Sequence, residues 1–118
     1  MAQQRTVTAD LTITGFCSTS AIIVKNSLKT SDYTVTTDDY YIGVQVSTQA
    51  VTITLPESSP AGQVFIVADT NGLATTSLPI NIVPSGSDTI NGSSVGTAII
   101  GGWSALSFIS NGSGYNIF

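Results

Sequence analysis

The hydrophobic and polar positions near the N-terminus predict two β-strands followed by a connection. From residue 6 to residue 14, apolar side chains alternate strictly with Thr and Asp, which is typical of a strand with one buried face. Its apolar side consists of Val7, Ala9, Leu11 and Ile13. Residues 21–24 are continuously apolar and predict a second strand, buried on both faces. Residues 25–32 are mostly polar and predict an exposed connection.

The rest of the chain contains short β-favouring runs separated by Gly, Pro, Asn and Ser. Nine runs are visible, at residues 33–36, 40–46, 50–55, 63–68, 78–83, 88–90, 95–100, 103–109 and 115–118. So many short runs leave no room for a helix of ordinary length. They predict an all-β fold, a compact single domain of about ten short strands. A sandwich, a prism and a short β-helix all remain open as its architecture.

Three Asn-Gly dipeptides predict tight turns, because Asn and Gly tolerate positive φ angles. They are Asn71-Gly72, Asn91-Gly92 and Asn111-Gly112, twenty residues apart each time. The regular spacing indicates stacked or meandering strands. The first pair follows Asp69 closely, and we interpret that stretch as a hairpin turn rather than a calcium loop, because it lacks a downstream bidentate Glu.

The composition indicates that part of the surface is covered by another chain. Only 10 of the 118 residues, or 8%, are charged, against roughly 25% in an ordinary soluble domain. With 17 Thr and 16 Ser, the polar faces of the strands consist mainly of hydroxyls. Hydroxyls are far easier to desolvate than charges. Together with a positive mean hydropathy of +0.32, this composition favours an oligomer.

The charge distribution divides the chain into an N-terminal segment and a β-body. The net charge is −4, and the three basic residues, Arg5, Lys25 and Lys29, all lie in the first quarter. So few basic residues argue against a nucleic-acid partner. We expect residues 1–32 to form a strand or arm that attaches to a neighbour, and residues 33–118 to form the body. No apolar run is long enough to span a membrane, and no signal region is visible at the N-terminus, so we expect neither membrane insertion nor secretion by that route.

The residue types argue against catalysis and against a bound metal or cofactor. The chain has no His, which removes the usual general base and the commonest transition-metal ligand. Four carboxylates could in principle form an acid–base pair, but all lie in predicted turns, where capping of the local backbone is the favoured role: Asp38, Asp39, Glu57 and Asp69. The single cysteine, Cys17, is expected to be a small buried hydrophobe.

Six aromatic residues are candidates for a shared role. They could form a sugar-stacking platform, or they could anchor the core or a subunit interface, where Tyr and Trp are enriched. The second interpretation is favoured. The residues are Tyr33, Tyr40, Tyr41, Trp103, Tyr115 and Phe118.

Residues 33–118 resemble β-structured modules of bacteriophage virion proteins, including tail fibres, tailspikes and small head proteins. The resemblance is carried by VTITLP at residues 51–56, GQVFIVAD at 62–69, NGLA at 71–74, INI at 80–82, GSDTING at 86–92 and LSFISNGSGYNIF at 106–118. It implies compact β-units that assemble as homotrimers. It also implies a place in a virion, with synthesis in the host cytoplasm.

Among the parts of a virion, the short chain favours a capsid decoration, or cement, protein, since a fibre needs a long shaft. Such a protein would bind the major capsid protein through its N-terminal segment. The candidate attachment residues are Arg5, Val7, Leu11, Ile13, Lys25 and Lys29. The alternative is a tail fibre or tailspike module that binds host glycan or joins the spike to the tail.

Overall fold

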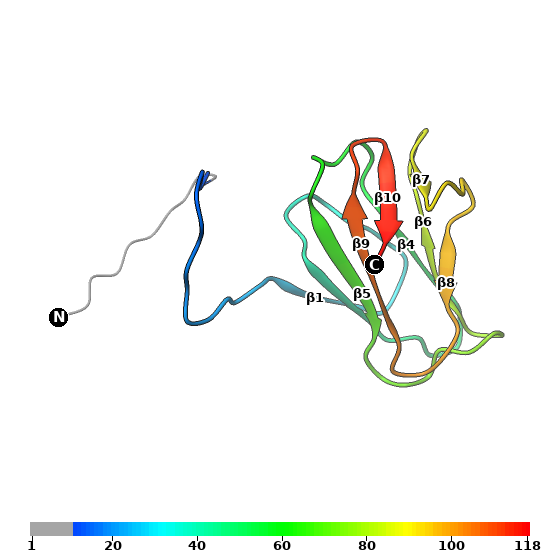
Figure 1. Ribbon diagram of the computed structural model, residues 1–118. Helices are drawn as coiled ribbons and strands as arrows, with labels where there is room; N and C mark the ends of the chain where they lie inside the picture. Colours follow the sequence, from blue (N-terminus) through cyan, green and yellow to red (C-terminus); the bar gives the residue numbers. More distant parts are fainter. Residues whose placement is uncertain (1–10) are drawn as a thin grey trace.

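The computed structural model describes residues 11–118, and these residues form ten short β-strands and no helix (Figure 1). The strands are β1 (Asn26–Lys29), β2 (Tyr33–Thr34), β3 (Tyr41–Val44), β4 (Val51–Thr54), β5 (Val64–Asp69), β6 (Ile80–Val83), β7 (Thr89–Ile90), β8 (Thr97–Ile99), β9 (Ala105–Ser110) and β10 (Gly114–Ile117). The predicted all-β class is confirmed. The described residues accordingly include no helix long and apolar enough to cross a membrane.

The first six strands alternate between two sheets. Strands β1, β3 and β5 pair in parallel in one sheet, and β2, β4 and β6 pair in parallel in the other. The chain therefore winds through three successive coils, each adding one strand to both sheets. The coils differ in length, since Asn26 lies opposite Tyr41 and Tyr41 lies opposite Ile66. The twenty-residue spacing of the Asn-Gly pairs is thus not the period of the coils.

The last four strands extend both sheets mainly by antiparallel pairing. Strand β9 pairs with β5, and β10 folds back on β9 as a hairpin. Strand β7 pairs in parallel with β10, giving the order β1-β3-β5-β9-β10-β7. Strand β8 pairs with β6, giving the order β2-β4-β6-β8. Both sheets thus grow away from β1 and β2, where the N-terminal segment enters (Figure 1).

The core lies between the two sheets. Alternation along β4 and β6 turns Val51, Ile53, Ile80 and Ile82 inward and leaves the residues between them half-buried. The largest fully buried side chains come from the other sheet: Phe65, Phe108 and Tyr115. Because one face of each sheet is apolar, packing the two faces together removes most of the body's large apolar side chains from water.

Each of the nine runs predicted from residue 33 onward overlaps one strand, but the strand predicted at residues 21–24 is wrong. Those residues are exposed and unpaired, and the strand is β1, inside the segment expected to be an exposed connection. In β1 the inward residue is Ser27, 8% exposed, whereas Leu28 points outward and is 57% exposed. This polar-in, apolar-out pattern reverses the one on which the prediction rests.

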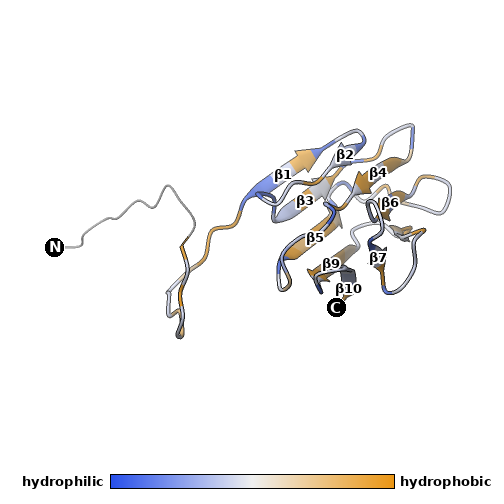
Figure 2. Cartoon of the chain, turned by 90° about the horizontal axis from the view of Figure 1, so that it is seen from above, coloured by the Kyte–Doolittle hydropathy of each residue, from blue (hydrophilic) through white to orange (hydrophobic). Residues whose placement is uncertain are grey.

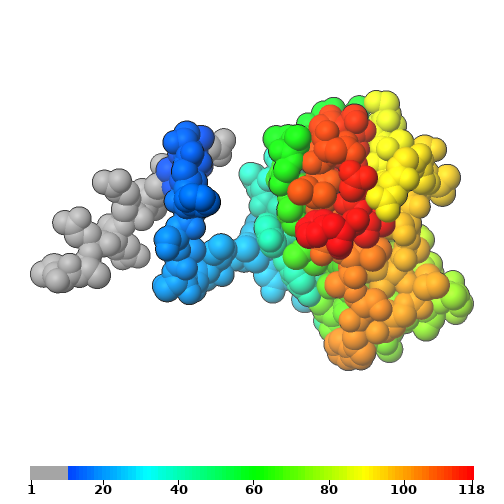
Figure 3. All heavy atoms as spheres, viewed as in Figure 1, coloured from blue at the N-terminus to red at the C-terminus, as the bar shows by residue number. Residues whose placement is uncertain are grey.

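The N-terminal arm, defined here as residues 11–24, extends away from the body (Figures 1 and 3). Apolar residues continue along the arm outside the two sheets, as the hydropathy colouring shows (Figure 2). Strand β1 lies before the expected boundary between residues 32 and 33, yet it belongs to the sheet of the body. The β-body in the structure therefore includes β1, and the arm ends just before Lys25.

Candidate functional site

The arm exposes large apolar side chains at both of its ends, on either side of the polar residues 18–20. The exposed fraction of Ile23 is 98%, and the other five large apolar side chains of the arm are exposed too: Leu11, Ile13, Phe16, Ile22 and Val24. No charged residue occurs between Asp10 and Lys25. Large contiguous exposed apolar surface is typical of a segment that binds another surface.

Two of the predicted attachment residues, Leu11 and Ile13, lie on this arm, while Arg5 and Val7 lie outside the described residues. Residues 11–14 are not in a strand, so the described part of the strand predicted at residues 6–14 is absent. Cys17 is exposed, and the expectation that it is buried is wrong. It is exposed because the segment around it does not pack against the body.

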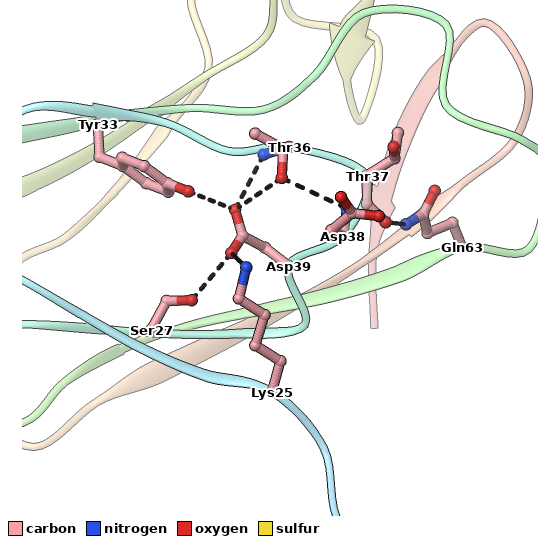
Figure 4. Close-up of polar contacts among 8 residues, drawn as sticks. All are labelled: Lys25, Ser27, Tyr33, Thr36, Thr37, Asp38, Asp39 and Gln63. Atoms are coloured by element: carbon pink, nitrogen blue, oxygen red, sulfur yellow. Dashed lines mark hydrogen bonds and ion pairs between the residues drawn. The ribbon is translucent and has the colours of Figure 1, made fainter. Parts of the chain in front are cut away.

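A buried carboxylate, Asp39, fixes the point where the arm joins the body (Figure 4). Its Oδ1 accepts a hydrogen bond from Ser27 Oγ at 2.8 Å and lies 3.2 Å from the Nζ of Lys25. Its Oδ2 accepts hydrogen bonds from Tyr33 Oη at 2.6 Å and from the Thr36 backbone N–H at 2.9 Å. We call these five residues the Asp39 anchor. It ties the first residues after the arm to the connection between β2 and β3.

The Asp39 anchor is built for an ionised carboxylate. Burial alone raises the pKa of Asp39, but the donors from Thr36, Tyr33, Ser27 and Lys25 outweigh burial and hold the pKa well below its ordinary value. Donating its hydroxyl to this carboxylate raises the pKa of Tyr33, and burial and the negative charge act in the same direction. The Asp39 carboxylate therefore has a structural role as an ionised hydrogen-bond acceptor, which does not suit it to exchange protons near neutral pH.

Both predicted basic attachment residues in the described chain have partners in their own protomer. Lys25 pairs with Asp39, and the Nζ of Lys29 lies 3.8 Å from the centre of the Tyr33 ring. A cation over an aromatic face is attracted by the electron density of the ring. The lysines therefore help to fix the base of the arm, and the exposed surface of the arm is uncharged.

A second buried carboxylate, Asp69, ties together two loops at one end of the strands. It accepts hydrogen bonds from the backbone N–H groups of Asn71, Gly72, Ala74 and Trp103 at 3.0–3.2 Å. Burial alone raises the pKa of Asp69, but these four donors outweigh it and lower the pKa. The carboxylate thus joins the loop after β5 to the loop before β9.

The four carboxylates do not form an acid–base arrangement. Asp38 and Glu57 are exposed, and Asp39 and Asp69 have lowered pKa values, the opposite of what a general acid requires. Among residues 11–118, no three His, Cys, Asp or Glu side chains gather in a way that could hold a metal ion.

The six aromatic candidates do not gather on one surface. Tyr115 is buried beside Phe65, with ring centres 6.0 Å apart, and its hydroxyl lies 2.7 Å from Ser59 Oγ. Tyr33 belongs to the Asp39 anchor, and Tyr41 is half-buried in β3. The other three are exposed in different parts of the chain: Tyr40, Trp103 and Phe118. A shared aromatic platform is therefore absent from the described residues.

Two Asn-Gly pairs form hairpin turns. Asn91 and Gly92 have φ angles of 48° and 79°, and the residues that flank them exchange two backbone hydrogen bonds of 2.9 Å. At the second turn, the Asn111 N–H donates to Gly114 O at 3.0 Å where β9 turns into β10. At the first turn, positive φ at both Asn91 and Gly92 matches the right-handed twist of a hairpin, whereas at the second turn positive φ is found at Gly112 (91°) and not at Asn111.

The third pair, Asn71-Gly72, does not form a hairpin, and that prediction is wrong. It follows β5 in one sheet and precedes β6 in the other, so it turns a corner between sheets. Gly72 has a φ of 76°, and the Asp69 carboxylate caps this turn by accepting hydrogen bonds from the backbone N–H groups of Asn71 and Gly72. The Asp-x-Asn-Gly sequence signals a capped turn but does not say which sheet the next strand joins.

Sequence reasoning missed the Asp39 anchor. Two adjacent aspartates among threonines indicate only a turn, and the polar residues 25–32, which include Lys25 and Ser27, predict an exposed connection. The contacts of Ser27 and Lys25 with Asp39 depend on the parallel pairing of β1 with β3, which no local sequence pattern predicts.

No protein-family model matches the chain, and a search of curated proteins finds none that is similar to it.

Proposed function

We propose that the chain is a non-enzymatic structural protein of a bacteriophage virion, a small homotrimeric capsid decoration protein. Its N-terminal arm docks on the major capsid protein, and its β-body covers the capsid surface. The observation that carries this proposal is the arm, with six exposed large apolar side chains and no charge between Asp10 and Lys25. The resemblance of residues 33–118 to virion β-modules supplies the setting.

The energy available from the arm explains why several copies act together. Burying a large apolar side chain contributes about 1.5–3 kcal/mol, so six of them contribute on the order of 10 kcal/mol. Association costs about 4–15 kcal/mol in lost freedom, which offsets much of this gain. One arm alone therefore binds weakly. Three arms on a trimer bind more tightly, because the later arms dock at a high effective concentration.

The arm and its base have separate tasks in this proposal. The β-branched run at residues 22–24 suits the addition of a strand to an exposed sheet edge. The Asp39 anchor fixes the direction in which the arm leaves the body, which lowers the conformational freedom lost on docking.

The test compares matched variants for binding to capsids that lack the protein. Replacing Ile22 and Ile23 together with Asp puts two negative charges on the arm, and replacing Val95 with Asp puts one negative charge on an exposed site of the body. Co-sedimentation should show that the arm variant no longer binds, while the Val95→Asp variant saturates the capsids as the wild type does. Equal binding by both variants would place the attachment site elsewhere.

A tail fibre or tailspike module is the second candidate function, favoured by the exposed Trp103. Copy number per virion, measured by quantitative mass spectrometry, separates the two. Hundreds of copies fit a decoration protein, and a few tens or fewer fit a tail component. Binding of both wild type and arm variant to host cells but not to capsids would also favour the tail.

A further inference from the structure

Trp103 combines high exposure with a backbone conformation that aromatic residues rarely adopt. Its side chain is 73% exposed, and its φ is 64°, in the left-handed region. A non-glycine residue in this region is uncommon, and such outliers cluster at ligand-binding sites. The arm, the hairpin turns and the core leave Trp103 without a role.

The backbone around Trp103 is fixed by the buried Asp69. The Trp103 N–H donates to Asp69 Oδ2 at 3.0 Å, and the same carboxylate holds the loop that contains Asn71, Gly72 and Ala74. Asp69 is buried, so water competes little for these bonds. The unusual conformation at Trp103 is therefore a built feature of two joined loops.

The Trp103 indole packs against Gly72, which in turn lies against Gly102, and we call these two glycines the glycine seat. A Cβ atom at Gly72 would overlap the Trp103 indole, and a Cβ atom at Gly102 would overlap the Gly72 carbonyl. Glycine at both positions lets the two loops and the ring approach closely. The ring is thus backed by main chain, and most of its surface faces solvent.

The chemistry around the ring is neutral and rich in hydroxyls. Apart from the buried Asp69, residues 69–77 and 100–104 contain no charged side chain. They carry several hydroxyl or amide groups: Thr70, Asn71, Thr75, Thr76, Ser77 and Ser104. Among the described residues, Asn71 Oδ1 is the buried side-chain atom without a hydrogen-bond partner, one residue before the glycine seat. That oxygen is buried, so the polar groups open to a ligand are the exposed hydroxyls of Thr75, Thr76, Ser77 and Ser104.

A sugar fits these features better than a protein surface. The exposed large apolar side chains of the two loops are Leu73, Ile100 and Trp103, few for a standard protein interface of about 800 Å² per partner. A pyranose offers one face of C–H groups, whose partial positive charge suits the negative face of an aromatic ring. Its hydroxyls suit neutral hydrogen-bonding neighbours, and the two loops contain no Lys or Arg that could pair with a phosphorylated or acidic sugar.

We propose that Trp103, on its glycine seat, is the stacking surface of a carbohydrate-binding site for a neutral pyranose ring. The site lies on the body and does not involve the arm, so it is independent of capsid docking. With one aromatic ring, affinity is expected to be weak, on the order of millimolar. Several copies on one particle would raise the avidity.

Tryptophan fluorescence of the full-length protein tests the proposal, because Trp103 is the chain's one Trp. The protein is titrated with glucose, galactose, N-acetylglucosamine, N-acetylgalactosamine and neutral oligosaccharides of host surface polysaccharide. At least one sugar should give a saturable change in emission. Variants at Trp103 have no Trp emission, so saturation-transfer NMR of the sugar is used to compare their binding with that of the wild type.

The variants separate stacking from folding. Trp103→Ala should lose the NMR signal of the bound sugar, with affinity at least about tenfold weaker, while Trp103→Phe should retain part of it. Phe118→Ala, at an aromatic residue of similar exposure (69%), should bind as the wild type does. Circular dichroism and melting temperature verify that each variant is folded. The Ile22→Asp, Ile23→Asp arm variant should also bind sugar normally, so failure of capsid docking leaves this result unaffected.

Two results would overturn the proposal. One is the absence of a saturable response to every sugar at concentrations of tens of millimolar. The other is a blue shift of the emission with protein concentration alone, accompanied by loss of the oligomer in Trp103→Ala. That second result would assign Trp103 to a contact between copies of the chain.

Discussion

The arm and the body are made of similar residues but have opposite relations to water. Both are rich in Thr, Ser and β-branched residues and poor in charge. In the body, large apolar side chains such as Phe108 are fully buried, whereas Phe16 in the arm is fully exposed. Composition therefore does not decide which segment folds. Residues 26–117 find strand partners in neighbouring coils, and residues 11–24 find none within the described chain.

The largest expected effect comes from shortening the same residue type in the two regions. Phe108→Ala removes a buried ring from the core and should lower the free energy of unfolding by about 3–5 kcal/mol, through lost burial and a cavity. Phe16→Ala should change it by less than about 0.5 kcal/mol. Urea denaturation of both variants measures the difference. A large loss at Phe16 would mean that the arm packs on a body in solution.

The next effect concerns the junction between the two regions. Asp39→Asn removes the charge that accepts hydrogen bonds from Ser27, Tyr33 and Thr36, and should lower the free energy of unfolding at pH 7 by about 1–3 kcal/mol. Asp38→Asn, at the exposed neighbour, is the matched control and should have little effect. Equal effects would show that the anchor does not hold the base of the arm.

The same junction predicts a dependence on pH. The folded pKa of Asp39 lies below its ordinary value of 3.8, so its contribution is fully present well above pH 3.8 and is lost as the pH falls below it. Asp69 acts in the same direction. Stability of the wild type should therefore fall in acid below about pH 4. The fall should be smaller in Asp39→Asn, which lacks one of the two groups, and a fall of equal size would contradict the assignment.

A smaller effect comes from adding the same side chain at a glycine in each region. Gly92 in the body has a φ of 79° with open space around it, so Gly92→Val meets no neighbour but forces a β-branched residue into the left-handed region. The expected loss is about 1–2 kcal/mol. Gly15→Val, in the arm, also meets open space and should leave the melting temperature unchanged. An unchanged melting temperature for Gly92→Val would show that the turn can adopt another form.

The sequence predictions were more accurate for the core strands of the body than for the arm and its base. Local patterns predicted strands such as β4 and β6, where apolar residues alternate and face the core. Local patterns did not predict β1, in which Ser27 faces inward and donates a hydrogen bond to the buried Asp39. Periodicity reports which residues are apolar, and cannot report that a buried carboxylate makes an inward serine favourable.

The candidate sites were less predictable than the strands. The exposed apolar residues of the arm could be read as a strand, because an unpaired β-favouring run and a paired one have the same sequence pattern. The sequence marks Trp103 as an aromatic candidate, but the conformation of this residue depends on Asp69, which lies thirty-four residues earlier. Such pairings follow from the order of strands in the sheets, which differs from their order in the chain.

The last expected effect leaves stability unchanged and reports directly on the arm. Cys17 is exposed on the arm, and it is the chain's one cysteine, so a thiol-reactive dye labels that position alone. In the free protein the labelling rate should equal that of an unfolded peptide, because none of residues 11–118 covers the thiol. On capsids carrying the protein the rate should fall at least about tenfold, since a docked arm is protected until it detaches. The Ile22→Asp, Ile23→Asp variant mixed with the same capsids should label at the free rate. Equal rates for wild type in both states would show that the arm stays exposed on the particle, and attachment would then have to come from the body.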